Sequence, residues 1–193
     1  DTKHPIIMEN LHGIKRTLGS RQKAKKPLLI NDLKLIIKAL DKEKKEKLRN
    51  RALILVGFAG GFRRSELVNL ENDDIEFVDE GVKILIKRSK TDQSGEGIIK
   101  AIPYFDNQEF CPVIALKEYI KSKSETSNNK KIFKISDKSV ALIIKRYAKI
   151  AGLDPSRYAG HSLRSGFATT AAEFGAEERN IMAMTGHKTT QMV

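Results

Sequence analysis

Three short segments with strand-like alternation lie between two groups of helical segments, and this order constrains the fold more than any other feature. The segments cover about residues 74–77, 82–87 and 98–103, and polar or glycine-containing turns separate them. Small antiparallel sheets of this kind are marginal alone and must pack against helices. The sequence therefore predicts a mostly helical α+β domain with one small three-stranded antiparallel sheet.

The helical segments are identified by apolar residues that recur at helical spacing. This periodicity predicts helices over residues 31–40, 41–59, 64–70, 112–121, 137–151, 162–174 and 176–185. We expect Asn31 and Ser162 to be N-cap residues, because their short polar side chains can accept from free N–H groups. Glycines follow several of the segments, as expected at helix C-termini. The helix after Ser162 should present one apolar stripe, formed by Leu163, Phe167, Ala171 and Phe174.

Residues 1–27 do not resemble the start of the same domain. Residues 5–18 predict an amphipathic helix, and a basic segment with Lys23, Lys25 and Lys26 follows it. Such a segment would suit contact with a phosphate backbone, although charge runs are usually just solvated. We interpret residues 1–27 as the last helix and linker of a preceding domain, and residues 28–193 as the main domain.

The charge of the chain points to a polyanionic partner. The formal net charge is +12 and the pI about 9.7, and nucleic acid is the commonest polyanion for such a protein. A membrane is disfavoured, because no apolar run approaches the roughly twenty residues of a spanning helix and no signal peptide is recognisable. The single cysteine, Cys111, fits a reducing compartment, and we expect a structural role for it.

Two histidines and an arginine are placed near predicted helix ends. His161 and Arg164 fall at a helix N-terminus, where free N–H groups favour an anion. His187 follows Gly186, the expected C-cap of the next helix. Taken alone, the His161-x-x-Arg164 pattern is better explained by ordinary surface polar residues, because short motifs match by chance.

Four short motifs, taken together, resemble those of the tyrosine recombinase (phage integrase) family. Gly61-Phe62-Arg63-Arg64-Ser65-Glu66-Leu67 resembles its "GLRxSEL" box, and Lys90 is similar to its β-hairpin lysine. His161-x-x-Arg164 and Gly186-His187 resemble its last two boxes. The order of the four motifs and the helix–sheet–helix plan agree from about Leu28 to Val193. The resemblance further implies that a DNA-binding domain precedes this one.

The resemblance implies a specific chemistry. The family cleaves and rejoins DNA through a 3′-phosphotyrosine, without metal, ATP or any other cofactor, and as a homotetramer on double-stranded DNA. Fixed donors must surround the charge that gathers on the phosphate oxygens, and guanidinium groups suit this task. By resemblance, Arg63 and Arg164 clamp the phosphate and Lys90 is the general acid. His161 assists proton transfer, His187 donates to the phosphate, Glu66 orients the site, and Arg64 and Arg88 contact DNA. The resemblance also implies a cytoplasmic, DNA-associated protein of bacterial or phage origin.

The nucleophile is the one expected residue that the printed chain does not contain. In this family it lies roughly nine residues beyond the last-box histidine, whereas the chain ends six residues after His187 (193 minus 187). Tyr104, Tyr119, Tyr147 and Tyr158 do not fall there; Tyr119 and Tyr147 are expected in the core. We therefore expect a catalytic domain cut just before its attacking tyrosine, and a fragment that is inactive without it.

Two function classes stay open. The first is a site-specific DNA recombinase or integrase, and the second is a non-catalytic DNA-binding relative that keeps the basic surface. A type IB topoisomerase is disfavoured by the Ser65-Glu66-Leu67 box and the short chain. A small-molecule enzyme is disfavoured because no Gly-rich phosphate loop or metal-ligand cluster is recognisable.

Overall fold

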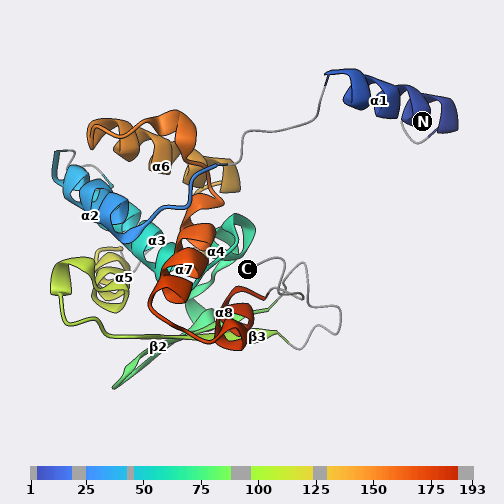
Figure 1. The fold of residues 1–193 in the computed structure, drawn as a ribbon. Coiled ribbons are helices and arrows are strands. Elements are labelled where there is room, and N and C mark those ends of the chain that lie inside the picture. The colour runs from blue at the N-terminus through green and yellow to red at the C-terminus, as the bar shows by residue number, and fades with distance from the viewer. Residues whose placement is uncertain (1–3, 19–24, 43–45, 88–96, 124–129, 187–193) are drawn as a thin grey trace.

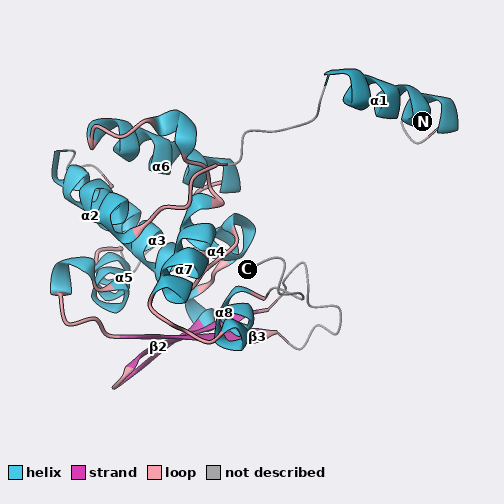
Figure 2. Ribbon diagram, in the orientation of Figure 1, coloured by secondary structure: helices cyan, strands magenta, loops and turns pink. Residues whose placement is uncertain are grey.

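The structure is a computed structural model, and it describes residues 4–18, 25–42, 46–87, 97–123 and 130–186 (Figure 1). Helices make up most of it, and one small sheet lies at an edge of the helical body (Figure 2). The helices are α1 (Pro5–Leu18), α2 (Ile30–Ala39), α3 (Lys47–Ala59), α4 (Arg64–Asn69), α5 (Pro112–Lys121), α6 (Asp137–Ile150), α7 (Ser162–Glu173) and α8 (Glu178–Thr185). Short 3-10 turns cover Leu40–Lys42, Asn72–Asp74, Gln108–Phe110 and Pro155–Arg157.

The sheet has the strand order β1-β2-β3, with both pairs antiparallel. Its strands are β1 (Ile75–Val78), β2 (Gly81–Ile86) and β3 (Ile98–Pro103). One face is buried, because alternate residues of β2 and β3 point towards the helices. On that face Val82 pairs with Ile102, and Ile84 pairs with Lys100. The α+β fold with a three-stranded antiparallel sheet, predicted from the sequence, is confirmed.

Helix α3 lies at the centre of the core. It packs against α5 and α7, while α2 packs against α6 and α7 against α8. Residues Ala52 to Gly57 are buried, as expected for a helix that is apolar on nearly every side. A Cβ atom at Gly57 would come within 2.9 Å of Leu163 and 3.0 Å of Leu67, so this glycine allows the close approach of α3 to α7 and α4.

The first residues of the main body are fixed to α7. The Leu28 amide donates to the Ser162 carbonyl at 2.9 Å, and the Lys26 amide donates to the Arg157 carbonyl at 2.7 Å. Gly166 lies directly against this segment, since a Cβ atom there would be 2.1 Å from the Leu28 carbonyl oxygen. The chain entering the domain is therefore anchored beside the start of α7.

Helix α1 stands apart from the helical body (Figure 1). Its apolar side chains are exposed, for example Ile6 at 62% and Ile14 at 52%. Its assignment to a preceding domain stays a prediction. Among the residues described, no helix has both the length and the apolar character needed to span a membrane.

Several helix starts differ from the sequence-based expectation. Ser162 is the first residue of α7 rather than its N-cap, which is His161. The Ser162 hydroxyl instead accepts from the Ala159 amide at 2.9 Å. Helix α2 begins at Ile30, with Leu29 as its N-cap in place of Asn31. Phe174, expected on the apolar stripe of α7, is 79% exposed, because it is the C-cap residue at the end of that helix.

Candidate active site

The candidate site is built around the turn Gly60–Gly61 at the end of α3. Gly61 has φ of 54°, a conformation that favours glycine. A Cβ atom at Gly61 would lie 2.9 Å from Phe167 on α7 and 3.2 Å from Thr185 on α8. Three helices distant in the sequence therefore converge on this turn, and there is no room for a larger residue.

Arg63 follows the turn and is held by Glu66, one helical turn later. Its backbone amide and its guanidinium Nη1 donate to the two carboxylate oxygens of Glu66, at 2.9 and 2.7 Å. The Arg63 Nη2 donates to the Gly186 carbonyl at 3.2 Å. Arg63 thus links α4 to Gly186, the C-cap of α8.

Arg164 reaches the same turn from the first helical turn of α7. Its Nη1 donates to the Gly61 carbonyl at 3.0 Å, and the residue is only 3% exposed. Its buried Nη2 has no hydrogen-bond partner among the described residues. Burial, followed by the charge of Arg63, lowers the pKa of Arg164 to about 10, so the guanidinium stays charged at neutral pH. A buried cationic donor without a partner is energetically unfavourable unless a ligand satisfies it.

Lys100 is a third cation at this place, and sequence reasoning did not assign it to the site. It lies on β3, and its Nζ donates to the Gly60 carbonyl at 2.8 Å. Its distance to the Glu66 carboxylate is 3.8 Å. The alternation of β3 could have revealed it, because Lys100 takes the inward position between Ile98 and Ile102.

The charges around Glu66 shift the pKa values of the cluster. Burial alone would raise the pKa of Glu66, but the charge of Lys100 and the hydrogen bonds from Arg63 hold it below its usual value. Burial lowers the pKa of Lys100 to about 8, and Arg164 and Arg63 add to that effect against the opposing charge of Glu66. Three cationic side chains therefore face one carboxylate, which leaves the cluster with excess positive charge.

His161 lies at the exposed edge of the cluster, as the N-cap of α7. Partial burial lowers the pKa of His161, and the positive charges of Arg64, Arg164 and Arg63 lower it further. A neutral imidazole at pH 7 can accept or pass on a proton. Arg64 packs against Gly160, the residue before His161, because a Cβ atom at Gly160 would lie 1.8 Å from the Arg64 Cδ.

The other residues predicted from the sequence divide into two groups. Lys23, Arg88, Lys90 and His187 lie outside the described residues. Lys25 and Lys26 are described and contact the protein itself. The Lys25 Nζ donates to the Ser156 carbonyl at 2.8 Å, and Lys26 forms an ion pair with Asp32 at 2.7 Å. The structure thus brings together Arg63, Glu66, His161 and Arg164, with Arg64 beside them.

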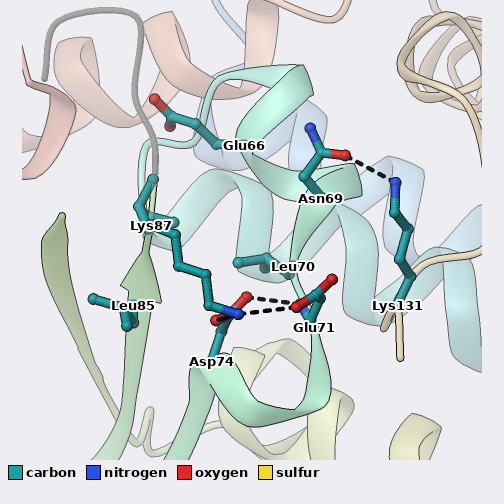
Figure 3. Close-up of a pocket in the computed structure, with 9 residues that line it drawn as sticks. Glu66, Asn69, Leu70, Glu71, Asp74, Leu85, Lys87 and Lys131 are labelled. Carbon is teal, nitrogen blue, oxygen red and sulfur yellow. Dashed lines mark hydrogen bonds and ion pairs between the residues drawn. The ribbon is translucent and has the colours of Figure 1, made fainter. Parts of the chain in front are cut away.

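A hollow of about 320 Å³ lies beside Glu66, between α4 and β2 (Figure 3). Two of its acidic residues share one lysine of the lining, since Lys87 forms ion pairs with Glu71 at 2.9 Å and Asp74 at 2.8 Å. These two carboxylates raise the pKa of Lys87 above its ordinary value. The hollow is therefore electrostatically distinct from the arginine cluster.

The tyrosines of the described chain have structural partners. Tyr158 is buried and donates its hydroxyl to Asp32 at 2.8 Å. Burial and Asp32 raise its pKa to about 12, which disfavours the phenolate form. Tyr147 is buried in the core and accepts from Asn50, whereas Tyr119 is half-buried and stacks on Phe133. Cys111 is also buried, and its sulfur accepts from the Phe105 amide.

The cluster can bind an anion by charge and by directed donors. Arginines on α4 and α7 lie around one turn, and a planar guanidinium can bind two oxygens of a phosphate. Within the described ranges, no group of three or more His, Cys, Asp and Glu side chains could hold a metal ion. The position of the two arginines favours electrostatic stabilisation of a phosphate by protein side chains.

Comparisons with known proteins identify similar sequences and folds. A sequence model described as "Phage integrase family" matches residues 26–193. An "Integrase/recombinase xerD homolog" of Selenomonas ruminantium is 42% identical over 203 aligned residues, which cover 99% of this chain and 59% of the relative. "Tyrosine recombinase XerC" of Caldanaerobacter subterraneus is 32% identical, over 86% of this chain and 46% of the relative. The chain thus spans about half the length of these relatives.

Solved structures share the fold at lower sequence identity. The XerH site-specific recombinase in a pre-cleavage complex with its difH substrate matches with a TM-score of 0.71 and 22% identity. That match covers 89% of this chain and 50% of the other. The XerA recombinase matches with a TM-score of 0.70 and 22% identity, over 97% of this chain and 67% of the other.

Proposed function

Because the chain belongs to the phage integrase family, we propose that it is the catalytic part of a site-specific DNA recombinase. In this proposal it cleaves one DNA strand through a 3′-phosphotyrosine, releases a 5′-hydroxyl and joins the 3′ end to another strand. The observation that carries the proposal is that Arg63 and Arg164 meet at one turn, where the buried Arg164 Nη2 has no hydrogen-bond partner among the described residues. A non-bridging phosphate oxygen would satisfy that donor.

Each residue of the cluster has a task in this reaction. Arg63 and Arg164 stabilise the negative charge of the transition state, and Glu66 keeps the Arg63 guanidinium in place. His161, with its lowered pKa, exchanges a proton with the nucleophile. By family resemblance, Lys90 protonates the leaving 5′ oxygen and His187 donates to the phosphate.

The nucleophile is proposed to be a tyrosine about three residues after Val193 in the full-length protein. In the sequence, that position would lie about ten residues after Gly186, whose carbonyl oxygen accepts from Arg63. The full-length protein is proposed to act as a homotetramer on double-stranded DNA. The second candidate, a non-catalytic DNA-binding relative, is favoured by the charge of +12 and would need neither the tyrosine nor the clamp.

Formation of a covalent adduct tests the proposal. The full-length protein would be incubated, without metal, with nicked duplexes selected from a random-sequence library for tight binding. A protein–DNA adduct that survives denaturation is expected for the wild type. Arg164→Ala and Arg164→Lys should reduce its rate by about 10²- to 10³-fold, since each removes donors used mainly in the transition state.

Arg179→Ala is the matched control, because Arg179 on α8 is exposed and pairs with Glu177, the N-cap residue of that helix, rather than with the cluster. Its adduct rate should equal that of the wild type at saturating DNA. Binding of the selected duplex without any adduct would instead support the non-catalytic relative. An adduct that forms equally well without Arg164 would contradict the proposed clamp.

A further inference from the structure

Lys100 occupies a place where a lysine is energetically unfavourable. The side chain is 4% exposed, and its Nζ lies 4.4 Å from the centre of the Phe62 ring. Arg63 and Arg164 add positive charge nearby. A methionine could fill similar space on β3 without the desolvation of an ammonium group, so stability alone does not explain this residue.

The contacts of Lys100 instead point to the two arginines. Its Nζ donates to the Gly60 carbonyl at 2.8 Å and lies 3.5 Å from the Gly61 carbonyl. The Gly61 carbonyl also accepts from Arg164 at 3.0 Å. The turn is therefore held from two sides, by a cation from β3 and by a cation from α7.

The second contact of Lys100 is the carboxylate that fixes Arg63. The Lys100 Nζ lies 3.8 Å from the Glu66 Oε2, and the same oxygen accepts from the Arg63 amide at 2.9 Å. Removal of the ammonium would change the balance of charge on Glu66 and remove a donor from Gly60. The position of Arg63 would change through its contacts with Glu66, and the position of Arg164 through its contact with the turn.

We propose that Lys100 is a positioning residue, which holds the Gly60–Gly61 turn and Glu66 so that Arg63 and Arg164 meet one phosphate in a productive geometry. The inference rests on the proposed function, because the phosphate belongs to that reaction. Lys100 does not itself need to touch the phosphate, since its donors are directed to the turn and to Glu66. It is thus separate from Lys90, the proposed general acid on the hairpin turn.

The test compares Lys100→Met with Lys100→Arg and Lys83→Met in the full-length protein. Lys83 is exposed on β2 and pairs with Glu76, so Lys83→Met removes the same charge outside the cluster. Affinity for a selected nicked duplex would be measured by fluorescence anisotropy. The adduct rate would be measured in single turnover at saturating DNA, on samples shown to be folded by circular dichroism.

Lys100→Met should lower the single-turnover rate by about 10- to 100-fold, because misplaced transition-state donors lose their effect. Its DNA affinity should stay within about threefold of the wild type, since most affinity comes from contacts with the DNA backbone. Lys100→Arg should recover most of the rate, as it restores a cationic donor towards Gly60 and Glu66. Lys83→Met should keep the wild-type rate.

A pH profile separates this role from a merely structural one. Lys100 faces Glu66 and Arg63 from the α4 region and Arg164 from α7. Loss of its proton should therefore weaken the wild-type reaction at alkaline pH, whereas the Lys100→Arg reaction should lack that decline because arginine stays charged. The inference is overturned if Lys100→Met cleaves at the wild-type rate. It is also overturned if the fall in the single-turnover rate of Lys100→Met is matched by an equal fall in its DNA affinity. A wild-type protein that forms no adduct would overturn the proposed function, and this inference with it.

Discussion

Replacement of Glu66 by glutamine should destabilise the protein strongly, because Glu66 is the carboxylate shared by the buried cations. Its side chain is 4% exposed, and it receives two hydrogen bonds from Arg63 and lies 3.8 Å from Lys100. Glutamine can still accept from the Arg63 amide, but it cannot balance the charges of Arg63, Arg164 and Lys100. Breaking a buried ion pair costs about 3–5 kcal/mol. Arg63 is 18% exposed, and the hydrogen bond from its amide can survive. We therefore expect the free energy of unfolding to fall by about 3 kcal/mol, the lower end of this range.

The dependence on pH gives this prediction a specific signature. The folded-state pKa of Glu66 lies below the ordinary value of 4.5, so the carboxylate contributes stability above about pH 4.5, and this contribution is lost as the pH falls through the folded-state pKa. The difference in the free energy of unfolding between wild type and Glu66→Gln should therefore be largest at pH 7 and decrease on acidification. Urea denaturation followed by circular dichroism at several pH values would measure it.

Glu118→Gln provides the control for Glu66→Gln. Glu118 pairs with Arg51 but is 48% exposed, so its loss should cost at most about 1 kcal/mol. A Glu66→Gln protein that is within 1 kcal/mol of the wild type at pH 7, on the order of the exposed pair, would refute the reasoning. So would a large difference that does not change between neutral and acidic pH.

Two further predictions concern Lys100 and Gly166. Because the pKa of Lys100 is lowered to about 8, the free energy of unfolding of the wild type should rise by about 2 kcal/mol between pH 7.5 and 9.5. Lys100→Met should lack this rise when both proteins are measured by urea denaturation. An identical rise in both proteins would contradict the prediction. Gly166→Ala should lower stability by about 1–3 kcal/mol, since overpacking is destabilising and the new Cβ would lie 2.1 Å from the Leu28 carbonyl oxygen. Gly13→Ala in α1, with open space around it, should show no such loss by the same measurement, and equal effects of the two substitutions would argue against the steric explanation.

The sequence allowed the helices and the sheet to be predicted because their apolar residues follow clear periods. The alternation in β2 and β3 is an example, since burial on one face imposes the pattern. Helix ends were predicted less well. Ser162 has the chemistry of an N-cap, but its hydroxyl accepts from Ala159 in a turn that precedes α7. The donor for the Ser162 hydroxyl therefore lies in a local turn and not in the first turn of the helix.

The candidate site was partly predictable for a different reason. Arg63, Glu66, His161 and Arg164 were found through resemblance of short motifs, and local periodicity could not have joined segments a hundred residues apart. Lys100 was missed because a lysine in a strand is usually solvated. The alternation of β3 contained the missing signal, since Lys100 takes the inward position between Ile98 and Ile102. The predicted roles of Lys90 and His187 stay predictions, because both lie outside the described residues.

The Gly60–Gly61 turn has a consequence for how the cations are solvated. Its carbonyl groups accept from Lys100 and from Arg164, while the Gly60 and Gly61 amides donate back to Val56 and Phe58 of α3. Neutral peptide dipoles thus take the place of water around two positive charges and do not cancel them. A carboxylate in the same place would neutralise the charge that an incoming anion should meet. The turn acts as a fixed solvent shell, which need not reorganise when negative charge develops nearby.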